Sequence, residues 1–520
     1  MKKMIKGRKM RYGSVTVALT LLITAALVIV NVISGALAGR FDWMFIDMNS
    51  HAVYDISEEC KDYLSAFVIP EVDRTNEQRA NDGEKKLSLE IIFCDEKENI
   101  EKELSQKYIH DSVRELETLF AGYFDISYLN IWENPTYAHS LGVSSTSDVV
   151  CRFGDRTHAV NLEDFYIFEG NNSSPVAYNG EKILASCLMR VTQKDEPMCY
   201  FTANHGETLE DYELVRAIVE AGYTVSFLDL SSDGIPEDCE LLVTYEPKQD
   251  FIVSDGVSSV SECDELQRYM NNGGKYLVFA SADTFVSGER ANFEAFLAEW
   301  GVGFKHEKGN DGIENCYLIK DSSNSLTVDG YTVVSRNSKV GLGGEVMADI
   351  ADRNVFANST CIYFADGFEY DGDGNYVAII NGNERIVSPL MTTYESAEAW
   401  AGGRAVARAA SDPFVLMSIS QQMTLSGEKA VLVASASSEF ANEAAMQSSV
   451  IGNNRALTGL LKYFGRENAP VDLVFKPFGG DEIETLTTKT ANTLTAVLTV
   501  LPAIIIAAVG TVILVRRKNR

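Results

Sequence analysis

The pair of side chains best suited to acid–base chemistry is His205 and Glu207, in the segment PMCYFTANHGE from Pro197 to Glu207. Histidine titrates near neutral pH, and a neighbouring carboxylate can orient its ring. The segment resembles a buried strand that ends in a turn, and open α/β sheets bind ligands at the carboxyl ends of their strands. No nucleophile accompanies the pair at a recognisable spacing. His205, Gly206 and Glu207 are therefore a candidate ligand or interaction turn, and a purely structural turn is the simpler alternative.

Two serines and a glycine cluster lack the neighbours that their chemistry requires. Ser281 and Ser435 each follow a strand-like run, but neither has the glycine flanks of a Gly-x-Ser-x-Gly nucleophile elbow. The cluster Gly341–Gly344 is not followed by Lys-Ser/Thr, and the chain contains no P-loop motif. We therefore expect a protein that does not hydrolyse ATP itself and has no catalytic serine.

One acidic run resembles the opening of a calcium loop. It is Asp371-Gly-Asp-Gly-Asn375, but Tyr376 and Gly382 stand where such a loop needs Gly and Glu. A β-turn between two short strands explains the run better. No group of His, Cys and Asp has metal-ligand spacing either, so we expect no metal, no cofactor and no catalytic residues.

The cysteines give no sign of redox or zinc chemistry. No two of them are closer than 12 residues, so the chain has neither a CxxC dithiol nor a zinc-ribbon spacing. Several lie in apolar strand-like runs, which predicts that most are buried small hydrophobic residues. The nine are Cys60, Cys94, Cys151, Cys187, Cys199, Cys239, Cys263, Cys316 and Cys361.

The chain is acidic, but its charge is unevenly distributed. Its 520 residues include 45 Lys and Arg against 74 Asp and Glu, a net charge of −29. Ten of the basic residues lie in two tails, residues 1–13 and 516–520, which carry no acid. Between the tails, 35 basic residues therefore face 74 acidic ones. Such a body repels phosphate backbones, so we expect no nucleic acid among its partners.

Each basic tail adjoins a long apolar run, which predicts two transmembrane helices, residues 14–37 and 495–515. A bilayer core of about 30 Å requires about 20 helical residues, and both runs are long enough. Lys and Arg remain on the cytoplasmic side, which places both termini in the cytoplasm. We thus expect a two-pass protein of the plasma (inner) membrane, held in lipid by two helices, with an extracytoplasmic body. A cleaved signal peptide is the alternative for the first run, and a buried helix for the second.

The hydrophobic patterns between these runs predict two modules of the α/β class and a stalk. Residues 38–170 show a strand, a helix over about 99–123, a strand over 124–135, and a hairpin that turns at Gly154-Asp155. Residues 175–470 begin with an amphipathic helix and continue with four buried runs separated by helices, which predicts a parallel sheet. From about residue 302 to 422 the pattern is irregular and strand-rich, and residues 471–494 form the predicted stalk.

Several segments, in this order, resemble the auxiliary subunits of ABC-2-type transporters, the family that includes the gliding-motility auxiliary protein GldG. They cover most of residues 40–470, and Asn204 stands where the family has the first glycine of its Gly-His-Gly-Glu turn. They are FDWMFIDMNSHAVYDIS, YAHSLGVSSTSDVVCRFGDRTHAVNLEDFY, CYFTANHGE, PLMTTYESAEAW and NNRALTGLLKYFG.

The resemblance implies a thioredoxin-like first module, followed by a module similar to class I glutamine amidotransferases without their catalytic residues. The dithiol of a redox-active thioredoxin would follow the first strand, where this chain has Asp95-Glu-Lys-Glu98. The resemblance also implies that an ABC permease and an ATPase are separate partner chains. We therefore expect a non-catalytic auxiliary subunit of an ABC-type transport system. A membrane-anchored ligand receptor, and an amidohydrolase-type enzyme using His205 and Glu207, remain the alternatives.

Overall fold

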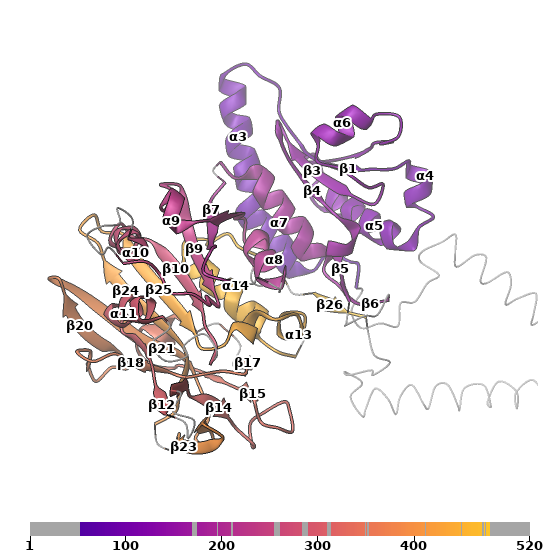
Figure 1. Cartoon of the computed structure of the whole chain (residues 1–520). Helices are drawn as coiled ribbons and strands as arrows, with labels where there is room; N and C mark the ends of the chain where they lie inside the picture. The colour runs from indigo at the N-terminus through magenta and orange to yellow at the C-terminus, as the bar shows by residue number, and fades with distance from the viewer. Residues whose placement is uncertain are drawn as a thin grey trace, which may run out of the picture. The chain divides into compact units, whose positions relative to one another are not determined.

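The described parts of the chain lie between residues 53 and 478 (Figure 1). The computed structural model describes residues 53–168, 174–194, 196–207, 209, 212–253, 261–282, 290–308, 314–348, 350, 353–410, 412–448, 450–470, 473 and 475–478. Both basic tails, the predicted membrane spans and most of the predicted stalk lie outside these ranges. Within them, no helix combines the length and the apolar character that crossing a bilayer requires. Residues Tyr54–Phe478 form one unit, called the body below.

The body begins with a long helical segment that starts after Ser57. The side chain of Ser57 accepts a hydrogen bond from the backbone N–H of Cys60, which satisfies one of the free donors of the first turn. The segment consists of α2 (Glu58–Tyr63), one π-helical turn, η2 (Leu64–Val68), and α3 (Ile69–Asn81).

A four-stranded sheet follows, with the order β2-β1-β3-β4. β1 (Leu89–Phe93) and β2 (Phe124–Tyr128) are parallel, and the hairpin of β3 (Val149–Phe153) and β4 (Arg156–Val160) lies antiparallel beside β1. The hairpin turns at Gly154 and Asp155, as predicted, and Gly154 has the positive φ (64°) that glycine tolerates. Helices α4 (Lys97–Ile100) and α5 (Leu104–Leu119) connect the two parallel strands.

The second strand is shorter than predicted. We expected it to continue to Pro135, but β2 ends at Tyr128. The side chain of Asn130 accepts hydrogen bonds from the backbone N–H groups of Trp132 and Glu133, which turns the chain. Pro135 then begins a short helix, α6 (Pro135–Ser140), where a missing N–H costs nothing. The alternating pattern was therefore wrong in this stretch because a local side-chain turn replaces the strand.

Helix α7 (Gly180–Thr192) joins the two halves of the body. The sequence predicts an amphipathic helix here, but 12 of its 13 residues are buried. One side packs against β3, β4 and η2, and α8 (Tyr212–Glu220) also contacts it. A helix that is covered on all sides lies inside the protein rather than on its surface. Although α7 was predicted to begin the second module, it also covers the first sheet.

The largest sheet has five parallel strands in the spatial order β25-β10-β9-β7-β8. The four predicted strands are β7 (Met198–Thr202), β8 (Thr224–Leu228), β9 (Cys239–Tyr245) and β10 (Lys275–Phe279), and their parallel pairing is confirmed. β25 (Lys429–Ser435) is the fifth, parallel to β10. Numbered along the chain, the order is 2-1-3-4-5, which is one of the common orders of doubly wound sheets.

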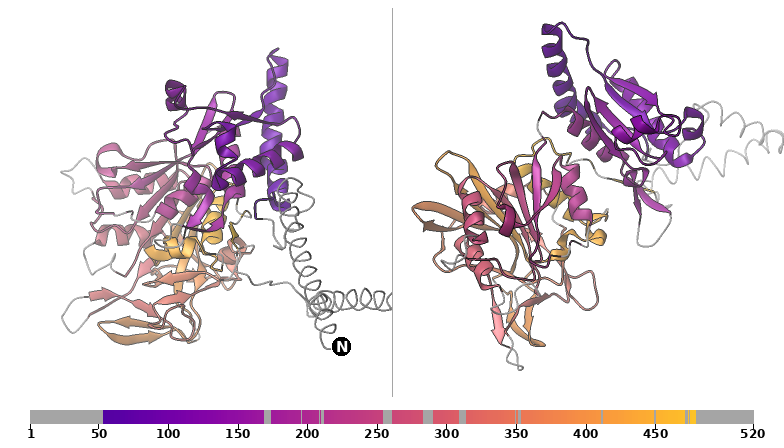
Figure 2. Two further views of the ribbon diagram at one scale, coloured as in Figure 1. Left: turned by 90° about the vertical axis from the view of Figure 1, so that its right-hand side faces the viewer. Right: turned by 45° about the horizontal axis from the view of Figure 1, so that its top comes forward.

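Helices cover both faces of this parallel sheet (Figures 1 and 2). Leu277 and Phe279 of β10 belong to a core that includes α8 and α14 (Asn453–Tyr463). Tyr276 and Val278 belong to a second core with α10 (Glu262–Asn271) and α11 (Ala291–Glu299). Successive side chains of a strand point to opposite faces, so a strand buried on both sides is apolar throughout.

The predicted strand-rich region extends the sheet with antiparallel strands and adds small sheets beside it. β24 (Val415–Met423), β21 (Asn383–Thr392), β20 (Tyr376–Ile380) and β19 (Glu369–Tyr370) continue in this order from β25. The shorter strands are β11 (Val302–Phe304), β12 (His306–Lys308), β13 (Glu314–Cys316), β14 (Leu318–Lys320), β15 (Thr332–Val334), β16 (Arg336–Asn337), β17 (Val355–Ala357), β18 (Ile362–Phe364), β22 (Glu398–Ala401) and β23 (Arg404–Arg408). The remaining short helices are α9 (Leu230–Asp233), α12 (Gly341–Val346), η4 (Ser438–Ala441) and α13 (Glu443–Met446).

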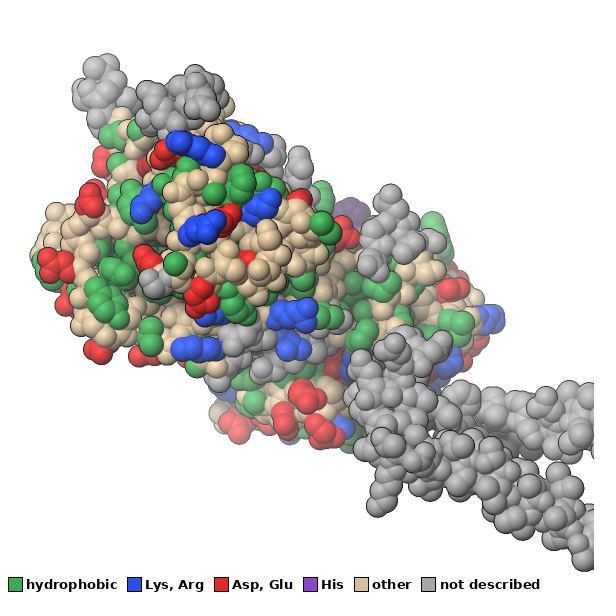
Figure 3. All heavy atoms as spheres, turned by 90° about the horizontal axis from the view of Figure 1, so that it is seen from below, with side chains coloured by type: hydrophobic (Ala, Val, Ile, Leu, Met, Phe, Trp, Pro, Cys, Tyr) green, Lys and Arg blue, Asp and Glu red, His purple; other side chains and the backbone are tan. Residues whose placement is uncertain are grey.

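The last strand of the body returns to its beginning. β26 (Lys476–Pro477) pairs with β6 (Pro175–Tyr178), which in turn pairs with β5 (Tyr166–Phe168) after the 3-10 turn η3 (Leu162–Phe165). Of these strands only β26 lies in the stalk predicted for residues 471–494, and it pairs with the body instead. On the face of the molecule shown in Figure 3, acidic and basic side chains are interspersed among apolar ones.

Candidate functional site

The predicted turn of His205, Gly206 and Glu207 lies at the carboxyl end of β7, where the order of the parallel strands reverses. β7 pairs with β8 on one side and with β9 on the other. Asn204 and Gly206 both have a φ of 76°, so the turn has two left-handed positions around the histidine. The location is the edge at which doubly wound sheets bind ligands, as the sequence predicts.

The His205 side chain is enclosed between two carboxylates. Its Nδ1 lies 3.1 Å from Oε1 of Glu207, and its Nε2 lies 3.0 Å from Oε2 of Glu262, the first residue of α10. The ring stacks on Phe251 with a centroid separation of 3.9 Å, and the residue is 3% exposed. Both ring nitrogens are therefore bonded inside the protein, and the ring is closed to solvent.

The two carboxylates keep His205 protonated. Burial acts to lower the pKa of His205, but the hydrogen bonds to Glu207 and Glu262 outweigh it and raise the pKa to about 9. Burial acts to raise the pKa of Glu207, yet the hydrogen bond from His205 leaves that pKa below its usual value. An imidazolium with both N–H groups donating has no free nitrogen to accept a proton. In this arrangement His205 and the two carboxylates connect the end of β7 to the start of α10. The imidazole is not free to act as a general base.

The backbone of the turn is also hydrogen-bonded within the protein. The His205 carbonyl oxygen accepts hydrogen bonds of 2.7 Å from the N–H groups of both Lys248 and Gln249. A Cβ atom on Gly206 would lie 3.1 Å from Cβ of Lys248, which adds a steric reason for glycine to its positive φ. The turn thus ties the end of β7 to the segment after β9.

The two serines and the calcium-like run have structural partners. Ser281 donates a hydrogen bond of 2.8 Å to Oε1 of Glu246. Ser435, which is 1% exposed, donates a hydrogen bond of 2.8 Å to the carbonyl oxygen of Ser437. The Asp371 carboxylate accepts hydrogen bonds from backbone N–H groups within its own turn, which joins β19 to β20. The predicted β-turn is confirmed.

The predicted glycine cluster is a packing feature. Gly341 begins α12 with a φ of 60°, and α12 packs against β21. A Cβ atom on Gly343 would overlap the carbonyl oxygen of Pro389 on β21. Glycine is therefore required because two backbones approach closely at this point.

The prediction that most of the cysteines are buried is confirmed. None of the nine forms a disulfide, and all but Cys263 are buried. Within the described ranges, no cluster of three or more His, Cys, Asp or Glu residues has the geometry to hold a metal ion.

The small β12–β13 hairpin carries a group of side chains that no sequence pattern indicated. His306 faces Cys316 across the two strands, with Nδ1 3.7 Å from the sulfur, and its Nε2 lies 3.2 Å from a Glu294 carboxylate oxygen. Hydrogen bonds to Cys316 and Glu294 raise the pKa of His306 to about 10. Burial raises the pKa of the Cys316 thiol, and the residue is only 4% exposed. The residue types are those of a thiol nucleophile and its base, but the thiol is protonated and enclosed.

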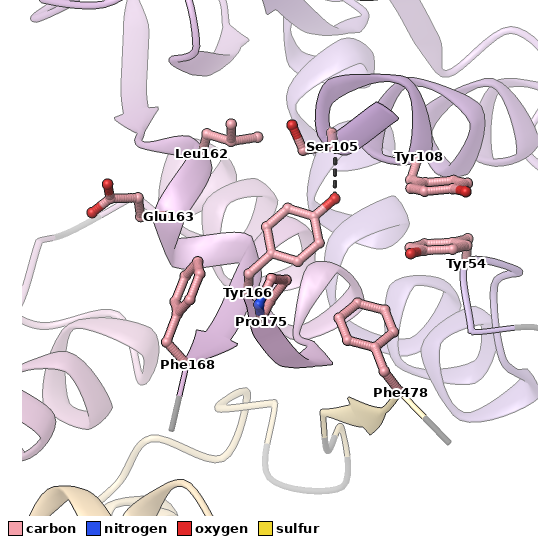
Figure 4. A pocket seen from close by; sticks show the side chains of 9 residues that line it. All are labelled: Tyr54, Ser105, Tyr108, Leu162, Glu163, Tyr166, Phe168, Pro175 and Phe478. Atoms are coloured by element: carbon pink, nitrogen blue, oxygen red, sulfur yellow. Dashed lines mark hydrogen bonds between the residues drawn. The ribbon is translucent and has the colours of Figure 1, made fainter. Parts of the chain in front are cut away.

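Described residues of the body line a pocket of about 790 Å³, which we call the aromatic pocket (Figure 4). Its size is typical of sites for small molecules. Five of its nine lining side chains are aromatic and only one is charged. The lining residues are Tyr54, Ser105, Tyr108, Leu162, Glu163, Tyr166, Phe168, Pro175 and Phe478.

Contacts among its own side chains hold the aromatic pocket in shape. The rings of Tyr54 and Tyr108 are stacked at a centroid separation of 3.7 Å. The Tyr166 hydroxyl donates a hydrogen bond of 2.6 Å to the Ser105 carbonyl oxygen, as Figure 4 shows. The ring of Phe478 lies 6.2 Å from that of Tyr54 and 6.3 Å from that of Tyr166. Sequence analysis missed this site because its rings come from distant segments that share no motif.

One buried carboxylate joins the two ends of the body beside this pocket. Glu181 of α7 accepts hydrogen bonds from the backbone N–H and the hydroxyl of Ser57, at 2.5 and 2.8 Å. It also forms an ion pair of 2.8 Å with Lys476, whose ammonium donates to the Asp55 carbonyl oxygen. The residues at which the chain enters and leaves the body are therefore bonded to the same side chain.

Comparison with known proteins adds little to this description. No protein-family model matches the chain, and no curated protein is similar to it in sequence. One solved structure, described as the mmIFT52 N-terminal domain, is similar over 52% of this chain and 97% of that chain, with 12% sequence identity and a TM-score of 0.34. At this identity and TM-score we draw no conclusion from the likeness.

Proposed function

We propose that the chain is a non-catalytic, membrane-anchored auxiliary subunit of an ABC-type transport system, with its acidic body outside the cytoplasm. The observation that carries the proposal is that the two ends of the body meet. Tyr54 and Phe478 have ring centroids 6.2 Å apart, and Glu181 binds both Ser57 and Lys476. A body whose ends leave at one point suits two neighbouring membrane anchors.

The sequence outside the body supplies the anchors in this proposal. Residues 14–37 and 495–515 are free of charged side chains, and each is bordered by a basic tail at its outer end. In this proposal each span is joined to the nearest end of the body by a segment of 16 residues. Two helices are too few to enclose a transport path, so the proposal requires a permease and an ATPase as separate chains.

The topology of the sheets supports the finer fold assignments within this proposal. The first sheet has the order β2-β1-β3-β4, in which two parallel strands are followed by an antiparallel hairpin, and α7 packs on this hairpin. This topology suits a thioredoxin-like module. The five-stranded parallel sheet with helices on both faces suits a module similar to class I glutamine amidotransferases. In both modules the resemblance implies a scaffold that binds partners rather than an enzyme.

The test is to purify the tagged full-length chain in mild detergent, at native expression, and to identify its partners by mass spectrometry. The proposal expects an ABC ATPase and a multispanning permease in stoichiometric amounts. A matched control carries the same tag on an unrelated two-span protein of similar abundance. Recovery of the chain alone, or only with partners that the control also retains, would contradict the proposal.

A ligand receptor is the second candidate, and the aromatic pocket favours it. A pocket of about 790 Å³ lined by five aromatic rings is the kind of cavity that binds small molecules. The two candidates are distinguished by their partners, because a receptor without a transport role would be recovered without a permease and an ATPase.

A further inference from the structure

The aromatic pocket contains more aromatic rings than the binding of an aliphatic ligand would require. Tyr54 precedes α2, Tyr108 lies on α5, Tyr166 and Phe168 lie on β5, and Phe478 follows β26. Aliphatic groups are held equally well by Leu, Ile and Val, of which Leu162 is the only one among the nine lining residues. Aromatic faces differ from aliphatic side chains in their negative quadrupole, which attracts positive charge. The lining therefore favours a ligand that interacts with ring faces.

The charges around the aromatic pocket favour a cation. Glu163 is the one charged side chain among the nine lining residues, and it is exposed at the rim. Figure 4 shows its carboxylate directed away from the rings, so it contributes attraction at a distance and no ion pair inside. The chain as a whole carries a net charge of −29, which raises the local concentration of cations.

One ring of the pocket already faces a cation of the protein itself. The ammonium of Lys107 lies 6.0 Å from the ring centroid of Tyr108, whose ring is also stacked on Tyr54. This distance is at the limit within which cation–π attraction operates. The contact shows that the ring of Tyr108 tolerates a positive charge as a neighbour, and this charge is itself paired with Asp111 at 2.5 Å.

The polar groups of the pocket decide which kind of cation fits. The Ser105 carbonyl oxygen already accepts the Tyr166 hydroxyl, and the Glu163 carboxylate points elsewhere. The other polar side-chain groups of the lining are the hydroxyls of Ser105, Tyr54 and Tyr108. A primary ammonium has three N–H donors, and each donor that loses water without gaining an acceptor is costly. A quaternary ammonium has no N–H group, so it loses no hydrogen bond on entering a cage of rings.

From these observations we infer that the aromatic pocket binds a small organic cation of the quaternary ammonium class. The recognition uses ring faces for the alkylated nitrogen and Glu163 for long-range attraction. The pocket is formed by described residues of the body alone, so the inference does not depend on the membrane proposal. If choline does not bind, the proposal of a transport subunit is unaffected, and the reverse also holds, because ligand binding and partner recovery are measured separately.

The test compares choline with two analogues on the full-length chain, by isothermal titration calorimetry and saturation-transfer NMR. The chain is kept in a maltoside detergent, because detergents with choline head groups would compete. The first analogue, 3,3-dimethyl-1-butanol, replaces the charged nitrogen of choline by carbon and should bind about tenfold more weakly. The second, ethanolamine, carries the N–H donors and should also bind at least tenfold more weakly. Equal binding of choline and its neutral analogue, or no binding of choline, would overturn the inference.

Variants of the pocket locate the binding. Phe478→Leu and Tyr108→Leu keep an apolar side chain but remove a ring face, and each should weaken choline binding about fivefold to tenfold. Tyr212→Leu is the matched control, because Tyr212 is 83% exposed and does not line the pocket. Thermal unfolding of each variant establishes that the body is intact. Choline binding that survives both pocket substitutions in folded protein would exclude the aromatic pocket as the site.

Discussion

At the scale of single residues, the imidazole of His205 links folding to proton binding. Its pKa of about 9 in the folded body exceeds the value of about 6.5 expected in an unfolded chain. The folded state therefore binds the proton more tightly, and the stabilisation is complete below about pH 6.5 and is lost as the pH rises through 9. We expect the contribution of His205 to the free energy of unfolding to fall by about 2–3 kcal/mol between pH 6.5 and pH 9.5, as measured by urea denaturation of the protein and of a variant that lacks this histidine.

The variant His205→Gln separates this contribution from that of His306. The pKa of His306 is also raised, to about 10, so it shifts stability in the same direction over an overlapping range. His205→Gln should lower stability at pH 6.5 and remove a large part of the dependence on pH. His139→Gln, at an exposed histidine, is the control and should leave the pH profile unchanged. An unaltered profile in His205→Gln would show that the imidazole is not the titrating group.

The sequence predicts the contacts of a single residue only where its partners are close to it in the chain. His205 and Glu207 are two residues apart, and their proximity was predicted. Glu262, which completes the arrangement, lies 57 residues beyond His205 and is placed there by the start of α10. Its position depends on how α10 packs, which no local spacing encodes. The aromatic pocket was missed for the same reason.

At the scale of elements, the first turn of α7 fastens both ends of the body. Glu181→Gln removes a negative charge that faces Lys476 and accepts from Ser57. Because the pair is largely buried, we expect stability to fall by about 1–3 kcal/mol. Hydrogen exchange should accelerate at the amide of Phe478, which bonds to Val176, and at the amide of Ser57.

The exposed Glu59, on the neighbouring helix α2, provides the control. Glu59→Gln removes the same charge at a solvated position and should change neither stability nor exchange. Unchanged protection of Phe478 in Glu181→Gln would mean that the pairing of β26 with β6 suffices to hold the chain end.

Helices and strands were predicted correctly where a single physical cause, such as burial of both faces of a sheet, explains the hydrophobic pattern. β7, β9 and β10 are mostly apolar because both faces of the sheet are covered, and the parallel arrangement was predicted from such runs separated by helices. The charged residues of α7 suggested an exposed face, but partners within the body satisfy them, as the ion pair of Lys182 with Glu220 shows. A pattern of polar and apolar residues cannot distinguish solvent from a buried partner.

At the scale of the whole molecule, the proposal of two anchors makes a prediction about topology. Tags at the N-terminus and the C-terminus should both be protected from protease in right-side-out membrane vesicles. The body between them should be accessible to the same protease, because it lies on the opposite side of the membrane. Digestion of either tag in intact vesicles would contradict a two-pass arrangement, and detergent lysis, which should expose both tags, is the control.

The meeting of the chain ends also determines how the body responds to tension. A pull applied through residues 53 and 479 acts on two points that are joined by the pairs Lys476–Glu181, Ser57–Glu181 and Lys476–Asp55. The load passes through these contacts and the pairing of β26 with β6, and neither the four-stranded sheet nor the five parallel strands lie along this path. The ends would separate before the sheets are strained, so force on the two tethers would open the aromatic pocket between Tyr54 and Phe478 while both cores stay folded.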